Sequence, residues 1–161
     1  MVAGFAGSVG GMTSAAFADS SGQSTTANVG VSSGITMTAL TSSFLLNGAP
    51  GAVVTLPNAV SYNVETNNVA GYAVTVQSVG PTMVGTGSNV DAIPIAALTA
   101  RDGGTSIGYA GLSNSAGTNV HNQSVRSANG GDILHTDYQI RIPVVNADTY
   151  TATLNYVATT K

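Results

Sequence analysis

Residues 60–77, VSYNVETNNVAGYAVTVQ, decide the fold that we expect for this chain. Two runs in this stretch alternate large apolar side chains with small or polar ones, the first over residues 60–64 and the second over residues 72–76. A period of two places the apolar side chains on one face of a β-strand. Asn67 and Asn68 lie between the runs and tolerate the backbone angles of a tight connection. The stretch therefore predicts two antiparallel strands joined by a polar turn.

The same alternation recurs toward the C-terminus. Residues 138–144 and 150–158 alternate on either side of Asn146-Ala147-Asp148, whose side chains favour a turn, and this pattern predicts a second hairpin. Residues 93–101 and 106–112 flank an Asp-Gly-Gly sequence, which predicts a third hairpin.

Shorter runs predict the remaining strands. They begin at Val29 and at Ile35, and a third covers residues 53–56 and is expected to stop at Pro57, which lacks a backbone donor. Two polar stretches, residues 80–90 and 113–131, are expected to be loops. No run longer than a turn or two keeps a period of 3.6 residues. The chain is therefore expected to be all-β, an immunoglobulin-like antiparallel β-sandwich of about eight or nine strands.

The charge content excludes several classes of function. Charged residues make up 7% of the 161 residues, against about 25% in typical soluble domains. The four cations are scattered at Arg101, Arg126, Arg141 and Lys161, so no basic face is available for nucleic acid or for anionic lipid. The chain has no cysteine, which excludes disulfides and thiolate chemistry. No segment is apolar for long enough to form a transmembrane helix.

The N-terminal residues suggest export. Residues 1–18 are small and apolar and end in Ala16-Phe17-Ala18, which fits the small-x-small rule for signal cleavage after Ala18. The positively charged start of a signal peptide is missing, so residues 1–18 are interpreted either as a signal-peptide remnant or as a flexible leader. Residues 19–161 show no linker or change of composition and are expected to form a single β-sandwich domain.

Three segments carry a resemblance to a known group of proteins. TTANVGVSSGITMTAL (25–40), TNNVAGYAVTVQS (66–78) and RIPVVNADTYTATLNYVATTK (141–161) resemble small secreted β-sandwich surface proteins of Gram-positive bacteria of the streptomycete type. ADTYTATLNYVAT (147–159) is also similar to the closing strands of WxL-type cell-surface domains, although the chain has no tryptophan and hence no WxL motif. The resemblance implies an exported surface protein of immunoglobulin-like architecture.

A metal site can be sketched around the second histidine. On a strand, Asp137 would share the face of His135, with Asp132 nearby in GGDILHTDY (130–138). A stable site takes three or four ligands, and two on one face are common in any strand. We therefore expect a polar, solvent-facing edge here, and neither a metal nor a cofactor.

Catalytic patterns are also missing from the sequence. No serine lies in a GxSxG motif. Glu65 is the sole glutamate, and no spacing pairs two carboxylates as a glycosidase requires. We therefore expect no catalytic residues and a protein that is not an enzyme.

The residues most suited to contact a ligand or another subunit are Tyr109, Asn67 and Asn68. Tyr109 is flanked by Gly108 and Ala110-Gly111, which leaves its ring available for stacking. Few charged gatekeepers protect the strand edges. We therefore expect a secreted structural protein that self-associates into a filament or surface layer, with Ser24–Ser32 adding a strand to a neighbour's sheet. The alternative is a module that binds cell-wall polysaccharide through Tyr109 and the polar loops.

Overall fold

The computed structural model describes residues 21–161. The chain divides into two units, Met1–Val31 and Ser32–Lys161, and each is described by itself. The expected leader, residues 1–18 with its cleavage point after Ala18, lies outside the described residues. Within the described part of the chain, no helix is long and apolar enough to cross a membrane.

The unit Ser32–Lys161 is built from β-strands and one turn of 3₁₀-helix, η1 (Ile95–Ala97). The eleven strands described within it are β1 (Ile35–Thr38), β2 (Val53–Thr66), β3 (Tyr72–Ser78), β4 (Thr82–Gly85), β5 (Ala92–Pro94), β6 (Leu98–Asp102), β7 (Ala110–Gly111), β8 (Thr118–Gln123), β9 (Asp132–Arg141), β10 (Tyr150–Thr151) and β11 (Leu154–Thr160).

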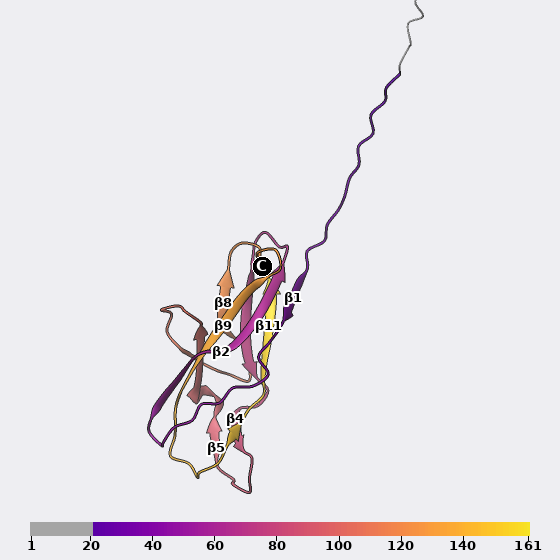
Figure 1. The fold of residues 1–161 in the computed structure, drawn as a ribbon. Helices are drawn as coiled ribbons and strands as arrows, with labels where there is room; N and C mark the ends of the chain where they lie inside the picture. The colour runs from indigo at the N-terminus through magenta and orange to yellow at the C-terminus, as the bar shows by residue number, and fades with distance from the viewer. Residues whose placement is uncertain (1–20) are drawn as a thin grey trace, which may run out of the picture. The chain divides into compact units, whose positions relative to one another are not determined.

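All strand pairs are antiparallel, and they form three sheets (Figure 1). The largest has the order β1-β2-β9-β6-β7, the second β11-β3-β8, and a small third β10-β4-β5. The inward side chains of the first two sheets meet in one apolar core, in which the rings of Tyr62 and Tyr156 lie 5.3 Å apart across the layers. The expected all-β antiparallel sandwich is confirmed. Its strand count exceeds the prediction because β5, β7 and β10 have only two or three residues, too few to show a period.

The stretch that decides the fold behaves differently from a hairpin. The inward faces are as expected: Tyr62 and Val64 of β2, and Tyr72 and Val74 of β3, are buried. However, β2 lies in the five-stranded sheet and β3 in the sheet β11-β3-β8, so the two strands face each other across the core instead of pairing. The prediction of a paired hairpin was wrong because alternation determines which face is buried and does not determine which strand is the neighbour.

The other two predicted hairpins had opposite outcomes. β6 pairs with β7 as expected, with Thr99 opposite Gly111. β9 pairs with β2 and β6, whereas β11 pairs with β3, so the hairpin expected around Asn146-Ala147-Asp148 was wrong. That turn sequence instead lies in a crossing between sheets.

β2 continues through Pro57, where the sequence predicted an end. A β-bulge between Leu56 and Val60 shifts its register against β9, and Asn58 takes a positive φ of 50°. At a bulge one residue needs no ladder partner, so a proline is tolerated there.

Three other local predictions also change. The strand expected at Val29 and Val31 is absent, because residues 21–34 are all exposed and without strand pairing, and the first strand begins at Ile35. The loops expected at residues 80–90 and 113–131 contain β4 and β8, respectively.

Candidate functional site

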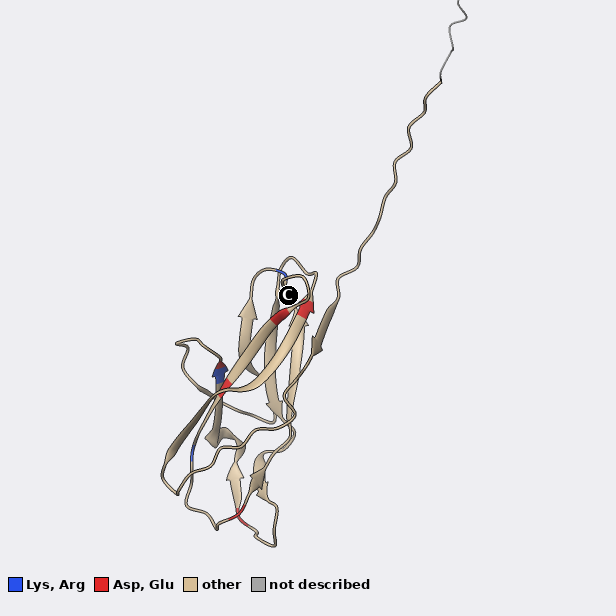
Figure 2. Ribbon diagram, viewed as in Figure 1, with Lys and Arg blue, Asp and Glu red and all other residues tan. Residues whose placement is uncertain are grey.

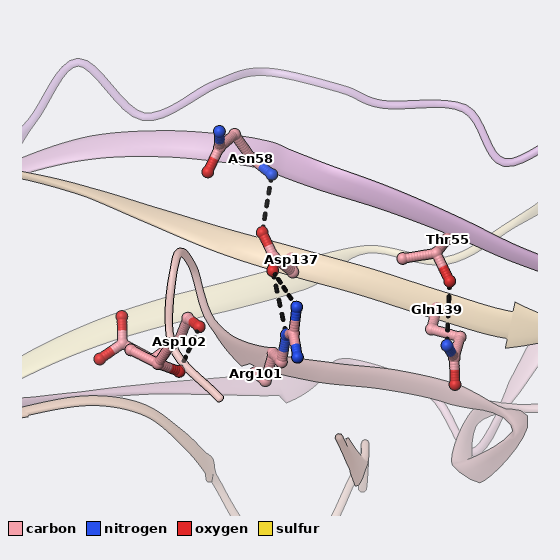
Figure 3. Close-up of polar contacts among 7 residues, drawn as sticks. Thr55, Asn58, Arg101, Asp102, Asp137 and Gln139 are labelled. Atoms are coloured by element: carbon pink, nitrogen blue, oxygen red, sulfur yellow. Dashed lines mark hydrogen bonds and ion pairs between the residues drawn. The ribbon is translucent and has the colours of Figure 1, made fainter. Parts of the chain in front are cut away.

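A buried ion pair occupies the outer face of the five-stranded sheet (Figure 3). Asp137 of β9 is only 2% exposed, and its Oδ2 accepts a hydrogen bond from Nε of Arg101 at 3.0 Å and forms an ion pair with Nη2 at the same distance. Its Oδ1 accepts a hydrogen bond from the backbone nitrogen of Asn58 at 2.8 Å. Both carboxylate oxygens are therefore engaged in fixing the bulge of β2 and the β6–β9 pairing, which is a structural role.

A histidine–aspartate pair joins the two main sheets at one edge of the core. His121 of β8 lies with Nδ1 2.9 Å from Oδ2 of Asp102, at the end of β6. Its Nε2 is buried and has no hydrogen-bond partner among the described residues. The two residues are 19 apart in the chain, and no sequence pattern linked them before the sheets were known.

The residues of the sketched metal site separate in the fold. His135 and Asp137 share the outer face of β9, as the period of two predicted, but Asp137 is committed to Arg101 and Asn58. Asp132 instead accepts hydrogen bonds from the Tyr72 hydroxyl at 2.8 Å and from other donors. Within residues 21–161, no three histidine or acidic side chains form a cluster that could hold a metal ion.

The environment of Asp132 also changes its titration. Burial raises the pKa of this carboxyl, but hydrogen bonds from the backbone of Ala128 and from the side chains of Tyr72 and Gln123 outweigh burial and lower the pKa below its ordinary value. The lowered pKa favours the ionised carboxylate, whose hydrogen bonds tie β3, β8 and β9 together.

Asn67 and Asn68 lie in the connection that crosses from β2 to β3, and their side chains hold the two ends of the folded unit. Asn67 accepts a hydrogen bond from the backbone nitrogen of Gly34 and donates one to the carbonyl of Ser32, both at 2.8 Å. Asn68 donates to the carbonyl of Lys161 at 3.0 Å. Both amides are used within the chain, where they anchor the residues that lead into β1 and the last residue of the chain.

Tyr109 precedes β7 and is partly covered. Its ring lies under the guanidinium of Arg101, whose central carbon is 4.5 Å from the ring centre. The hydroxyl is buried without a hydrogen-bond partner among the described residues. One face of the Tyr109 ring is thus covered by the Arg101 guanidinium. This cation–π contact helps to hold Arg101 in place beside Asp137.

An apolar groove of about 440 Å³ opens at the end of the sandwich where β2 begins. We call it the end groove. Its walls come from the segment before β2, from β4 and from the chain that follows β9, and they carry mainly apolar side chains: Phe44, Leu46, Met83, Ile140, Ile142 and Val145. Figure 1 shows β4 and β5 at this end, opposite the C-terminus.

Polar contacts brace the rim of the end groove. The Tyr150 hydroxyl donates a hydrogen bond to the carbonyl of Asn146 at 2.9 Å and accepts one from Asn89 at 2.6 Å. Asp148 accepts a hydrogen bond from the backbone of Gly87, and this contact together with one from the Thr149 backbone lowers its pKa below the ordinary value. The rim is therefore held in place, and Asp148 is the only charged residue that lines the groove.

The residues before β1 form the second unusual feature. Val29 and Val31 are 88% and 80% exposed, although they are apolar. They stand at odd positions of the chain, in phase with Ile35 and Met37, which point into the core. We call residues 24–32 the N-terminal segment. It has the composition and the alternation of a core strand, but no strand partner among the described residues.

The end groove could not be found from the sequence. Its residues come from stretches interpreted as turns or as half of a hairpin, and only the strand order brings residues 44–50 and 143–150 together. Comparison with protein-family models, with curated proteins and with solved structures finds no match to this chain.

Proposed function

We propose that the protein is a non-enzymatic structural protein of the cell surface, which associates with copies of itself by adding its N-terminal segment to a neighbour. The observation that carries the proposal is the exposed alternation in residues 24–32, in phase with β1 and without a strand partner in the described part of the chain. An alternating strand with one apolar face is stable only when that face is covered. A second copy of the chain can cover it.

The energetics support association of moderate strength. Burying a valine side chain fully contributes about 1.5–3 kcal/mol, so Val29 and Val31 together contribute about 3–6 kcal/mol before the losses of motion on binding are subtracted. Backbone hydrogen bonds of an added strand would contribute further.

The distribution of charge favours contact between copies. Residues 21–64 contain no charged side chain, and neither do the edge strands β1 and β11 (Figure 2). Monomeric sheet proteins commonly protect such edges with lysine and other charges. The edges of β1 and β11 therefore lack this protection against packing between molecules.

Location at the cell surface rests on the sequence. The expected cleavage after Ala18, the low charge and the resemblance to secreted Gram-positive surface proteins support an exported protein. An uncharged surface of Ser, Thr and Asn suits dense packing against like molecules outside the cell.

Light scattering and electron microscopy of the purified chain test the proposal. We expect a population of oligomers or filaments that grows with protein concentration. The double variant Val29→Asp and Val31→Asp should remain monomeric, because each carboxylate would have to be buried at the contact.

The matched control places the same charge on Ile107, which is 62% exposed and lies outside the N-terminal segment. Ile107→Asp should assemble as the unchanged chain does. A wild-type protein that stays monomeric at high concentration would contradict the proposal. Saturable binding of cell-wall polysaccharide by such a monomer would support the alternative function of a binding module.

A further inference from the structure

We propose that the end groove is the acceptor for the N-terminal segment of a second copy, with Val29 and Val31 inserted against its apolar walls. This inference rests on the proposed function, and it names the surface on which the association occurs. The two partners are a segment whose valines are exposed and a groove whose walls, among the described residues, are mainly apolar.

The chemistry of the two surfaces matches. The walls of the end groove include Phe44, Ile142 and Val145, which are only partly buried although they pack against the core. The N-terminal segment offers valines on one face and small or polar residues, such as Asn28 and Gly30, on the other. When the valines enter the groove, the polar face remains in water.

The dimensions match as well. An apolar cavity of about 150 Å³ holds a molecule the size of benzene, so about 440 Å³ leaves room for two valine side chains. Alternate residues of an extended chain stand about 6.6 Å apart on one face, and Val29 and Val31 have this relation. The braced rim keeps the groove open before a partner arrives.

The chain's own N-terminal segment is too short to fill its own groove. Asn67 holds Ser32 and Gly34 near the end of β2 at Thr66, whereas the end groove lies beside Val54. Twelve residues of strand separate these two points of β2, which is roughly 40 Å. Val29 is three residues from Ser32 and reaches at most about 11 Å from it. Val29 and Val31 can therefore enter only the end groove of a second copy.

This geometry leads to an open chain of subunits. The donor segment leaves the folded unit from the Thr66 end, and the acceptor lies at the opposite end, so the contact joins different surfaces of the two copies. Such a head-to-tail contact repeats without limit unless the rotation between subunits closes a ring. The inference thus favours filaments over closed dimers.

Disulfide trapping between single-cysteine variants of the full chain tests the acceptor. The protein contains no cysteine, so every disulfide joins two introduced cysteines, and the heterodimer is distinguished from the two homodimers by its mass. Val29→Cys is mixed with Leu45→Cys, whose side chain lines the groove and is 69% exposed, so that its replacement leaves the core intact. The parallel mixture pairs Val29→Cys with Val157→Cys, an exposed position on the edge strand β11.

We expect the mixture with Leu45→Cys to form the heterodimer at least tenfold faster than the mixture with Val157→Cys. Equal or faster trapping at Val157, or assembly without trapping at Leu45, would overturn the groove as acceptor and leave self-association intact. Monomeric protein with no trapping would overturn the proposed function as well.

A charge placed in the groove gives an independent measurement. Leu45→Lys should raise the concentration needed for assembly at least tenfold, whereas Ile107→Lys, at a position that is 62% exposed and lies away from the groove, should leave it unchanged. Equal assembly by the two variants would contradict the assignment.

Discussion

The strand β3 and the N-terminal segment have the same sequence pattern and opposite surroundings. In β3, Tyr72, Val74 and Val76 alternate with small or polar residues and are fully buried, because β3 pairs with β8 on one side and β11 on the other. In the N-terminal segment, Val29 and Val31 alternate with small or polar residues and are largely exposed.

The difference shows that a period of two determines which side chains share a face of the strand. The neighbouring strands determine whether that face is buried. β3 has its neighbours within the chain, whereas the N-terminal segment has no strand partner in the described part of the chain. The comparison yields predictions in which the same substitution has different effects in the two regions.

The largest effect is expected for a charge in β3. Val74→Asp should unfold the protein, because it places a carboxylate with no partner at a position with 0% exposure. Val29→Asp, the same change in the N-terminal segment, should alter the free energy of unfolding of the monomer by less than about 0.5 kcal/mol. Far-UV circular dichroism and urea titration measure both.

A folded Val74→Asp protein would show that the core tolerates a charge and would break the comparison. A large loss of stability in monomeric Val29→Asp would show that the segment already packs within its own molecule. Either result contradicts the distinction between the two regions.

A second effect, smaller but still large, concerns the bulge of β2. Asp137→Ala removes the acceptor for both Arg101 and the Asn58 backbone and should lower the free energy of unfolding by about 3 kcal/mol. Asp137→Asn keeps an oxygen for Asn58 and should lose about half as much. Neither substitution changes the N-terminal segment. Light scattering should therefore show that the folded fraction of each variant assembles as the unchanged chain does.

The faces of the strands were predictable, whereas their partners were not. Alternation alone placed Tyr62 and Tyr72 in the core correctly, since side-chain direction is a local property of the backbone. Pairing is a long-range property, and the turn residues at Asn67-Asn68 suit both a hairpin and a crossing between sheets. Only the hydrogen bonds from Asn67 to Ser32 and from Asn68 to Lys161 show that this connection anchors both ends of the folded unit.

The groove and the ion pairs were beyond sequence analysis for the same reason. Asp102 and His121, or Arg101 and Asp137, are brought together by strand order and carry no motif. The N-terminal segment is the opposite case: the sequence predicted a strand at Val29, and the described structure forms no strand there. We take an alternating pattern without a strand partner in its own chain as the signal that points to association.

Alkaline pH should act on the folded unit and spare the N-terminal segment, which has no titratable side chain. Burial raises the pKa of Tyr62, Tyr72 and Tyr138 well above the usual value of about 10. The pKa of each buried tyrosine is higher in the folded protein than in the unfolded chain. The contribution of these neutral hydroxyls to folding stability is therefore complete below pH 10 and is lost as the pH rises further. Absorbance at 295 nm should show these tyrosines ionising together with unfolding, and ionisation without unfolding would contradict their burial.

The smallest effect is expected where the two regions meet. Asn67→Ala removes two exposed hydrogen bonds, to Gly34 and to Ser32, and should lower the free energy of unfolding by about 1 kcal/mol or less. Hydrogen exchange at the Gly34 amide should become faster, while the Ala70 amide, bound by Asn68, stays protected. Asn68→Ala should give the reverse pattern. Assembly should persist in both variants, because the valines that we assign to the contact are unchanged, and its loss in Asn67→Ala alone would mean that the segment needs this anchor to reach its neighbour.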